Sequence, residues 1–566
     1  MKRLLLVIAS ALLCAAQSFE VLYAQSATDT CPRPSPGSTV QEPEDLHSQG
    51  GVLKVELTVR NEKLADGSTR YCYVDENGKQ SPNLRVHPGD LVILNLKNDL
   101  TDFSPDTAAA NHHHEHVGSD SNGCTSGSMT PASTNLHFHG LTIPPVCHQD
   151  DVMKTSIQPG DPAFEYKFRI PQDEPPGLYW YHPHIHGFTK QQLLGGASGA
   201  LIVEGIERAD NAVAGLPERV FVIRDQDLLN PNAPPSKSEP VVPKMLFDRD
   251  GDAANTGTGF GKPAKDISIN FVPVPYPDYP TAVIEIKPGE QQLWRVVNAS
   301  EVTYLNLEVL FGHTPQRLGL VALDGVPLNE NGSSRDFVDW QTHLGLPPGA
   351  RMEFMVKGPP AGVTGLLVTR TVDTGAGGEN DPNRAIATIM AADDAPAPRS
   401  ILSAAPTPLP APQLPWLASV TPVRTRRLYF SEKLLEPNNP NSAVEFYLTV
   451  DGQKAEQFDP KSGPNVVAKQ GTVEDWVIEN RSNELHAFHI HQLHFLLLDY
   501  RGRPVNEPFL RDTVNVPYYD GKALEYPSVR LRLDFRDPNT IGDFVYHCHL
   551  LEHEDGGMMG AIRVEP

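Results

Sequence analysis

The chain has 566 residues, of which 39% are hydrophobic and 21% charged, and its formal net charge at pH 7 is -23. This length exceeds one ordinary folded core and predicts several domains, because a domain averages roughly 150 residues. The acidic balance argues against a nucleic-acid partner, since phosphate binding depends on clustered Lys and Arg. The 53 prolines and 44 glycines favour many turns and an all-β architecture.

The N-terminal residues have the pattern of a secretory signal peptide. Two basic residues precede an apolar run from Leu4 to Ala16, and Ala24 offers a small residue for cleavage. The run is shorter than the ~20 residues that a membrane-spanning helix needs, and no later stretch qualifies. We therefore expect residues 1–24 to be a signal peptide and the remaining chain to be secreted or periplasmic, without a membrane span.

Five cysteines follow the predicted signal peptide, namely Cys31, Cys72, Cys124, Cys147 and Cys548. An odd number in an oxidising compartment leaves one cysteine unpaired. The first four lie in the N-terminal third and can form two disulfides, although their connectivity cannot be deduced from the sequence. This count singles out Cys548 as the free thiol.

A ten-residue pattern that begins at glycine, alternates apolar positions and ends in asparagine occurs three times. The copies are Gly89–Asn98, Gly289–Asn298 and Gly471–Asn480. Their separations of roughly 180 to 200 residues are too long for a solenoid and indicate three related domains.

We assign these domains to residues 25–205, 206–395 and 417–566, with a proline-rich extended linker at residues 396–416. Short runs in each domain alternate in polarity or are β-branched, and turn residues separate them. The sequence therefore predicts three β-sandwiches in series.

Four windows of the chain carry histidines at alternate positions. Their sequences are LHFHG, YHPHIHG, HAFHIHQLHF and HCHLLEHEDGGMM, and their same-face pairs are His137 with His139, His182 with His184, His489 with His491, and His547 with His549. Neutral imidazole suits copper, and eight ring nitrogens exceed the needs of one ion. We therefore expect a cluster of several ions between domains.

Strand parity separates a second metal site from this cluster. Cys548 lies between two cluster histidines and faces the opposite side of the strand, and His486 is an odd number of residues from His489. His553 and Met558 follow at a turn. Two imidazoles, a thiolate and a thioether form the ligand set of a blue-copper electron-transfer site, whereas zinc rarely takes methionine.

Taken together, the four windows resemble the copper-binding signatures of the multicopper oxidases. Two signatures lie in the first domain and two in the third, as in three-domain laccases, and the resemblance extends from about Val52 to the C-terminus. It implies three consecutive cupredoxin-like Greek-key β-sandwich domains and four copper ions, one of type 1, one of type 2 and two of type 3. It also implies a monomer that takes electrons from a small reducing substrate, such as a phenol or an aromatic amine, and reduces dioxygen to water.

The resemblance also assigns the ligands by position, with half of the trinuclear cluster in the first domain and half in the third. The type 1 ligands would be His486, Cys548, His553 and Met558. The type 2 ligands would be His137 and His489, and the two type 3 sets would be His139, His182 and His549, and His184, His491 and His547. Cys548 would be the ligand through which electrons enter.

Two acidic residues are candidates for proton delivery, because oxygen reduction consumes protons. Asp150 lies in the segment HQDDV, and Glu554 follows the predicted ligand His553. The choice between Asp150 and Asp151 stays open at this point.

Several positions depart from the family pattern or extend the windows. Ala487 and Gln492 stand where the family usually has proline and frequently has glycine, and neither is a ligand position, so we expect copper binding to persist. An insertion from about Thr101 to Thr134 carries the run NHHHEH, which includes the histidines from His112 to His116. Its polar composition favours a mobile loop over a copper site.

Three further histidines, His148, His186 and His494, lie outside the family's ligand positions. For His186 and His494 we expect surface positions or roles in supporting the ligands. We interpret His148 as ordinary loop sequence.

The main alternative function is that of a periplasmic cuprous oxidase in copper tolerance. That role resembles the same scaffold with a methionine-rich segment above the type 1 site, and the nine methionines of this chain are scattered. Three repeats and eight cluster histidines disfavour a two-domain nitrite reductase. A copper-free scaffold protein is disfavoured because every ligand position is retained.

Overall fold

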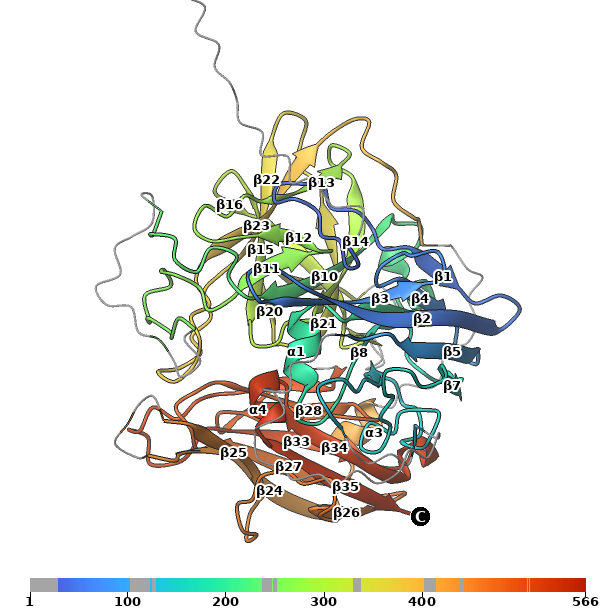
Figure 1. Cartoon of the computed structure of the whole chain (residues 1–566), viewed down its shortest axis with the longest axis vertical. Helices are drawn as coiled ribbons and strands as arrows, with labels where there is room; N and C mark the ends of the chain where they lie inside the picture. Colours follow the sequence, from blue (N-terminus) through green and yellow to red (C-terminus); the bar gives the residue numbers. More distant parts are fainter. Residues whose placement is uncertain are drawn as a thin grey trace, which may run out of the picture.

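The computed structural model describes residues 29–101, 123–124, 129–236, 247, 252–328, 337–401, 414–436, 439, 442–505, 507 and 509–566. Within these ranges strands far outnumber helices in the regular secondary structure, and the strands form six sheets (Figure 1). The all-β prediction is therefore confirmed. The predicted signal peptide and the NHHHEH run lie outside the described residues.

The first sandwich pairs a five-stranded sheet, in the order β1-β4-β9-β8-β6, with a four-stranded sheet, in the order β3-β2-β5-β7. Its strands are β1 (Asp45–His47), β2 (Val52–Lys63), β3 (Thr69–Asp75), β4 (Asn83–Val86), β5 (Leu91–Asn98), β6 (His137–His139), β7 (Phe164–Arg169), β8 (Gly177–His182) and β9 (Gly199–Val203). Phe164, Tyr166 and Phe168 of β7 are buried and their neighbours exposed, as expected for a sheet with one face on the core.

The second sandwich pairs an eight-stranded sheet, built along β12-β11-β10-β14-β21-β17-β18 with β19, with a six-stranded sheet, built along β13-β23-β22-β15-β16 with β20. Its strands are β10 (Glu218–Gln226), β11 (Asp266–Ile269), β12 (Val272–Val274), β13 (Ala282–Ile286), β14 (Gln291–Asn298), β15 (Leu305–Phe311), β16 (Thr314–Pro315), β17 (Leu318–Leu323), β18 (Val326–Pro327), β19 (Asp339–Gln341), β20 (Leu344–Leu346), β21 (Arg351–Lys357), β22 (Thr364–Thr369) and β23 (Arg384–Ala391). Its apolar core forms between the two sheets.

The third sandwich pairs a seven-stranded sheet, built along β25-β24-β27-β33-β29-β30 with β31, with a five-stranded sheet in the order β26-β35-β34-β28-β32. Its strands are β24 (Arg424–Leu434), β25 (Val444–Val450), β26 (Val466–Lys469), β27 (Val473–Asn480), β28 (His486–Ile490), β29 (Phe495–Tyr500), β30 (Arg503–Pro504), β31 (Leu510–Arg511), β32 (Thr513–Val516), β33 (Ser528–Asp534), β34 (Gly542–Cys548) and β35 (Met559–Glu565). The buried core of this sandwich includes Cys548 and Met558.

The three glycine-to-asparagine repeats occupy equivalent places in the three sandwiches. Each glycine has a positive φ, and the strands β5, β14 and β27 begin two residues later and end at the asparagine. Each asparagine amide donates to two backbone carbonyls, and its oxygen accepts from the N–H two residues on. Each repeat strand also runs parallel to an earlier strand and antiparallel to a later one. The repeat therefore marks a turn and strand that recur at the same place in all three sandwiches.

Short helices lie mainly at the junctions of the sandwiches. They are α1 (Thr189–Leu194), α2 (Ile206–Ala209), η2 (Asn211–Val213), α3 (Leu414–Ser419), η4 (Pro538–Thr540) and α4 (Leu551–Asp555). Helices α1 and α4 lie side by side between the upper part of the molecule and the third sandwich (Figure 1), and Asp555 accepts from the N–H groups of Thr189 and Lys190. A small apolar cluster at this junction includes Trp180, Val297 and Leu551, one from each sandwich.

The proline-rich linker predicted at residues 396–416 differs from expectation at its end, because helix α3 begins within it. Pro415 lies in the first helical turn, where its missing N–H costs no helical hydrogen bond. Three carbonyls, two in the last turn of α3 and one just after it, accept from the Arg532 guanidinium. These bonds satisfy acceptors that a helix leaves open at its C-terminus.

Two disulfides join the N-terminal cysteines, Cys31 to Cys72 and Cys124 to Cys147, and Cys548 is free and buried. The prediction of two disulfides and one free thiol is thus confirmed, and the connectivity that the sequence left open is settled. In the part of the chain that the structure describes, none of the helices has the length and apolar character to cross a membrane.

Candidate metal centre

Eight histidine side chains converge where the first sandwich meets the third. Strands β6 and β8 place His137 opposite His182, and strands β28 and β34 place His489 opposite His547. Each of the eight is at most 2% exposed: His137, His139, His182, His184, His489, His491, His547 and His549. The structure therefore brings together all eight histidines of the predicted cluster.

Half of these rings have one nitrogen against a protein oxygen and the other without a hydrogen-bond partner among the described residues. Four rings place Nδ1 against an oxygen, at 3.0 Å for His137 and the Asp150 carboxylate, 2.8 Å for His182 and the Pro183 carbonyl, 3.0 Å for His489 and the Asp512 carbonyl, and 2.9 Å for His547 and the Cys548 carbonyl. The nitrogens without a hydrogen-bond partner among the described residues include Nε2 of His137, His182, His489 and His549, and Nδ1 of His139, His491 and His549.

Unpartnered buried nitrogens indicate what the centre binds. A buried polar atom without a hydrogen bond costs about 1–3 kcal/mol, and a metal ion between the rings would satisfy several such atoms at once. Metal-bound histidines usually donate their second ring N–H to a protein oxygen, which fixes the ring orientation. The donor set therefore fits a group of copper ions.

In one set of three histidines, the Nε2 atoms lie close enough together to bind one ion. The Nε2 atoms of His184 and His491 lie 3.4 and 3.2 Å from Nε2 of His547. These three residues form one of the two type 3 sets that the resemblance assigns. In the other set, the ring centroid of His549 lies 5.1 Å from that of His139 and 5.7 Å from that of His182.

Burial controls the protonation of the cluster. It lowers the pKa of seven rings, that of His182 to about 3, and nearby histidines lower several of them further; the seven are His137, His139, His182, His184, His491, His547 and His549. Neutral imidazole is the form that binds metal, so the cluster is ready for metal binding at neutral pH.

The predicted type 1 residues meet inside the third sandwich. Sγ of Cys548 lies 3.5 Å from Nδ1 of His486 and 3.7 Å from Nδ1 of His553, and these two nitrogens lie 3.2 Å apart. Met558 is fully buried beside them, and its carbonyl accepts from the Cys548 N–H. The alternation of side chains along β34 thus places Cys548 on the face opposite the cluster histidines, as predicted.

The environment of the Cys548 thiol favours metal ligation over a free thiolate. Burial raises the pKa of this thiol well above its usual value, although the N–H groups of Leu550 and Ala487 act in the opposite direction. A bound cation would supply the positive charge that a buried thiolate needs.

The two predicted proton donors contact the histidine cluster. Asp150 lies 3.0 Å from Nδ1 of His137 and accepts from the Phe138 N–H, so its position favours Asp150 over Asp151. Glu554 lies 3.1 Å from Nδ1 of His547. Burial raises the pKa of Asp150 to about 8, and burial followed by Asp555 raises the pKa of Glu554 well above its usual range.

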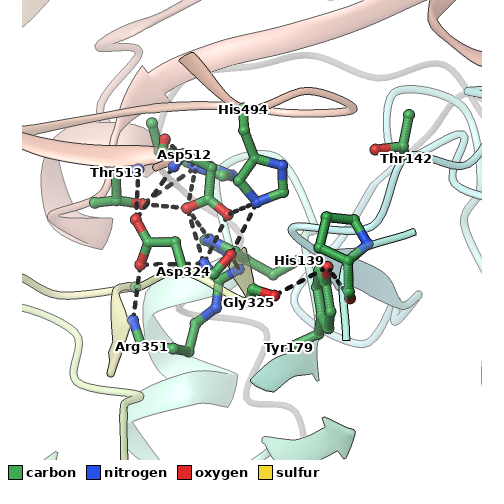
Figure 2. A network of polar contacts seen from close by, with 12 residues as sticks. His139, Thr142, Tyr179, Asp324, Gly325, Arg351, His494, Asp512 and Thr513 are labelled. Carbon is green, nitrogen blue, oxygen red and sulfur yellow. Dashed lines mark hydrogen bonds and ion pairs between the residues drawn. The ribbon is translucent and has the colours of Figure 1, made fainter. Parts of the chain in front are cut away.

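Sequence reasoning missed Asp512 and Arg351, which lie against the cluster (Figure 2). Oδ1 of Asp512 lies 3.3 Å from Nε2 of His139 and 2.8 Å from Nη1 of Arg351. Burial acts to raise the pKa of Asp512, but Arg351 and His489 lower it well below its usual range. The available signal was a carboxylate at the start of the apolar strand β32, which pairs with β28.

Gln492, which stands where the family frequently has glycine, has a φ of 58° and is buried. Few non-glycine residues adopt this backbone conformation. The Gln492 amide donates to Oδ2 of Asp150 across the boundary between the first and third sandwiches. This bond offsets the backbone strain and explains why a long side chain is tolerated here.

The three additional histidines lie outside the cluster. His494 donates from Nε2 to the Asp324 carbonyl at 2.8 Å, in agreement with a supporting role. His186 packs against Phe458. His148 is exposed and stacks on a phenylalanine ring.

Comparisons with known proteins agree with this geometry. Family models described as multicopper oxidase match residues 127–208 and 433–566, which carry the four histidine windows. The chain is 24% identical to the multicopper oxidase mco of Staphylococcus aureus over 76% of this chain and 77% of that protein. It is 23% identical to a laccase of Haloferax volcanii over 96% of this chain and 87% of that protein.

A solved structure supports the fold. The structure of a multicopper oxidase from Campylobacter jejuni, described as a metallo-oxidase, aligns with a TM-score of 0.62 and 22% identity over 94% of this chain and 96% of that chain. The three sandwiches are thus cupredoxin-like, as expected. From its motifs, its fold and these relatives together, we conclude that the chain is an oxidoreductase that belongs to the laccase-like multicopper oxidases.

Proposed function

We propose that this chain couples the one-electron oxidation of phenolic or aromatic-amine donors at a type 1 copper to the four-electron reduction of dioxygen to water at a trinuclear copper cluster. The observation that carries the proposal is the pair of sites joined by β34. Cys548 belongs to one site, and its two sequence neighbours, His547 and His549, belong to the other.

Copper would supply the redox chemistry when bound, and the chain would hold it in four positions. The type 1 position would use His486, Cys548 and His553 with Met558, and the type 2 position would use His137 and His489. The type 3 positions would use His139, His182 and His549, and His184, His491 and His547. Peptide bonds on both sides of Cys548 give a short covalent connection between the two sites.

Asp150 and Glu554 are proposed to deliver protons to the cluster. Each carboxyl group contacts a different cluster histidine, Asp150 beside His137 and Glu554 beside His547. A general acid must lie within hydrogen-bond reach of the group that it serves or act through one water molecule. Both carboxyl groups lie within hydrogen-bond reach of a cluster histidine, which supports the proposed role.

A second candidate function, oxidation of a cationic donor such as Cu(I), is favoured by two carboxylates beside the type 1 residues. Glu432 lies 3.2 Å from Nε2 of His486, and Glu484 lies 3.5 Å from Nε2 of His553. Negative charge on the outer edges of both rings would attract a cation. A Glu432→Gln variant should then raise KM for Cu(I) and leave KM for a neutral phenol unchanged.

We also propose export to the periplasm or beyond the cell. The signal-like residues 1–24 and the two disulfides support it, because disulfides persist mainly in oxidising compartments.

The test of the main proposal has two parts. Copper-loaded protein should contain about four copper ions per chain and absorb strongly in the visible range. Aerobic turnover of a phenol, an aromatic amine and Cu(I) would then rank the donors. A protein that gains no visible absorption on copper loading would refute the proposal, and turnover of Cu(I) alone would favour the second candidate.

A further inference from the structure

The second sandwich reaches the histidine cluster, although none of the twelve predicted copper ligands lies between residues 206 and 395. Its contacts include Arg351, at the start of β21, and the turn Asp324–Gly325 between β17 and β18 (Figure 2). The φ values of the two turn residues are 49° and 85°. Two successive positive φ values are typical of a tight hairpin turn, for which Asp-Gly is a favoured sequence.

This turn contacts both the first and the third sandwich. A Cβ atom on Gly325 would lie 2.7 Å from the Tyr179 ring, so the turn packs directly on strand β8, which carries His182. On its other side, the Asp324 carboxylate accepts from the N–H groups of Asp512 at 3.1 Å and Thr513 at 3.3 Å. The turn therefore fixes the start of β32 relative to β8.

The Arg351 guanidinium joins all three sandwiches. Its Nε donates to the Leu178 carbonyl at 3.1 Å, its Nη2 to the Asp324 carbonyl at 2.8 Å, and its Nη1 to the Asp512 carboxylate at 2.8 Å. The side chain is fully buried. The planar fork of an arginine can hold three acceptors in fixed directions, which a lysine ammonium cannot do.

Asp512, which Arg351 holds in place, contacts two predicted ligands. Its Oδ1 lies 3.3 Å from Nε2 of His139 and 3.6 Å from Nδ1 of His489, and its carbonyl lies 3.0 Å from the same Nδ1. With these outer nitrogens held, Nδ1 of His139 and Nε2 of His489 are the atoms without a partner among the described residues. Asp512 therefore determines which nitrogen each ring presents to the cluster.

We propose that Arg351 is a positioning residue through which the second sandwich, which provides no predicted ligand, controls copper occupancy of the histidine cluster, through the type 3 ligand His139 and the type 2 ligand His489. It holds the Asp512 carboxylate between a ligand of the first sandwich and one of the third. The inference rests on the copper assignment proposed above. Loss of a residue that orients metal ligands typically weakens metal binding about 10- to 100-fold.

The test compares Arg351→Lys and Arg351→Gln with wild type after copper loading. The measurements are copper per chain, visible absorption of the type 1 site, the electron paramagnetic resonance signal of the type 2 site, and thermal unfolding. Both variants should bind type 2 copper about 10- to 100-fold more weakly and keep the type 1 absorption. Arg351→Lys retains the charge, so equal losses in both variants would locate the effect in the guanidinium geometry.

Arg295→Lys is the matched control. Arg295 is also fully buried in the second sandwich, but its partners Glu218 and Glu353 make their ion pairs with arginines. This control should keep its type 2 signal. A parallel loss of that signal in Arg295→Lys and the Arg351 variants would reduce Arg351 to a structural role and overturn the proposal.

Asp512→Asn keeps the test decisive if neither Arg351 variant folds, because asparagine has nearly the same shape. It should show the same selective loss of type 2 copper, and a full type 2 signal would overturn the proposal. Failure of the underlying copper assignment is distinguishable, because wild-type protein would then bind no copper at either site.

Discussion

The two candidate sites differ in how the fold builds them. The predicted type 1 residues lie within the apolar core of one sandwich, and Cys548, His486 and His553 are less than 70 residues apart. The histidine cluster draws its rings from two sandwiches and its restraints from all three, as Asp150, Gln492 and Arg351 show. One site depends on the folding of a domain, and the other depends on how domains dock.

This difference suggests that the two sites can be damaged separately. Side chains in a well-packed core have little freedom to rearrange, so the type 1 residues should stay in place whenever the third sandwich folds. The cluster contains buried carboxylates and imidazoles whose positions depend on hydrogen bonds across the boundary. Small changes at that boundary should therefore reach the cluster first.

The largest expected effect is that of Cys548→Ser. Serine removes the thiolate, so donor oxidation and the intense visible absorption should both disappear while the chain still folds. The cluster should keep about three copper ions per chain, because its histidines are untouched. Absorption spectra, copper analysis and turnover with a phenol check this prediction, and unchanged turnover would refute the type 1 assignment.

Glu554→Gln should act on the other site. The variant keeps the shape of the side chain beside His547 and removes its acidic proton. Oxygen reduction should slow about 100-fold or more, which is the usual contribution of a general acid, and reduction of the type 1 site by donor should be unaffected. Stopped-flow absorption can follow the two steps separately, and equal slowing of both would argue against a role in proton delivery.

Gly349→Ala tests the contact between the second sandwich and the cluster. Gly349 has a φ of 85°, and an added Cβ would lie 2.7 Å from the His549 ring. We expect the free energy of unfolding to fall by about 2–4 kcal/mol and copper to be lost from the cluster before the type 1 site. Gly362→Ala is the control, because Gly362 has a φ of 75° and open space around it. This control should cost only about 1 kcal/mol of backbone strain.

The sequence predicted the type 1 site more fully than the surroundings of the cluster, for a physical reason. Strand alternation fixes which way His547, Cys548 and His549 point, so local spacing was sufficient. Arg351 and Asp512 are 161 residues apart in the chain, and no local pattern indicates that they meet. Only the docking of three sandwiches brings them together. Asp150 is distinguished from Asp151 by its contacts with His137 and Phe138 inside the first sandwich, which strand alternation alone does not predict.

Gln492→Gly is a milder change at the boundary between the first and third sandwiches. Glycine adopts the positive φ of this position without strain, but it cannot donate to Asp150. The relief of backbone strain and the loss of this hydrogen bond should nearly cancel, so the free energy of unfolding should change by less than about 1 kcal/mol. Type 2 copper, which His137 is proposed to hold, should bind about tenfold more weakly. Copper titration would expose a wrong assignment if the type 2 affinity matched that of wild type.

The smallest effect concerns the stability of the first sandwich, through a residue that contacts neither site. Burial raises the pKa of Glu174 to about 8, and its carboxylate oxygens lie 3.2 and 3.4 Å from the Thr142 N–H. Because the pKa of the folded state exceeds the usual value, Glu174 stabilises the fold at low pH, and this contribution is lost as the pH rises through 8.

Replacement of Glu174 by glutamine removes this titration, so Glu174→Gln should gain about 2–4 kcal/mol of unfolding free energy relative to wild type between pH 5 and pH 9. Denaturant unfolding of both metal-free proteins at the two pH values measures the difference, and titrations common to both proteins cancel.

The first sandwich supplies half of the cluster and none of the type 1 residues. Alkaline pH should therefore weaken the cluster before the type 1 site, and glutamine at position 174 should delay that loss. Equal pH profiles for both proteins would show that Glu174 does not limit the stability of the first sandwich.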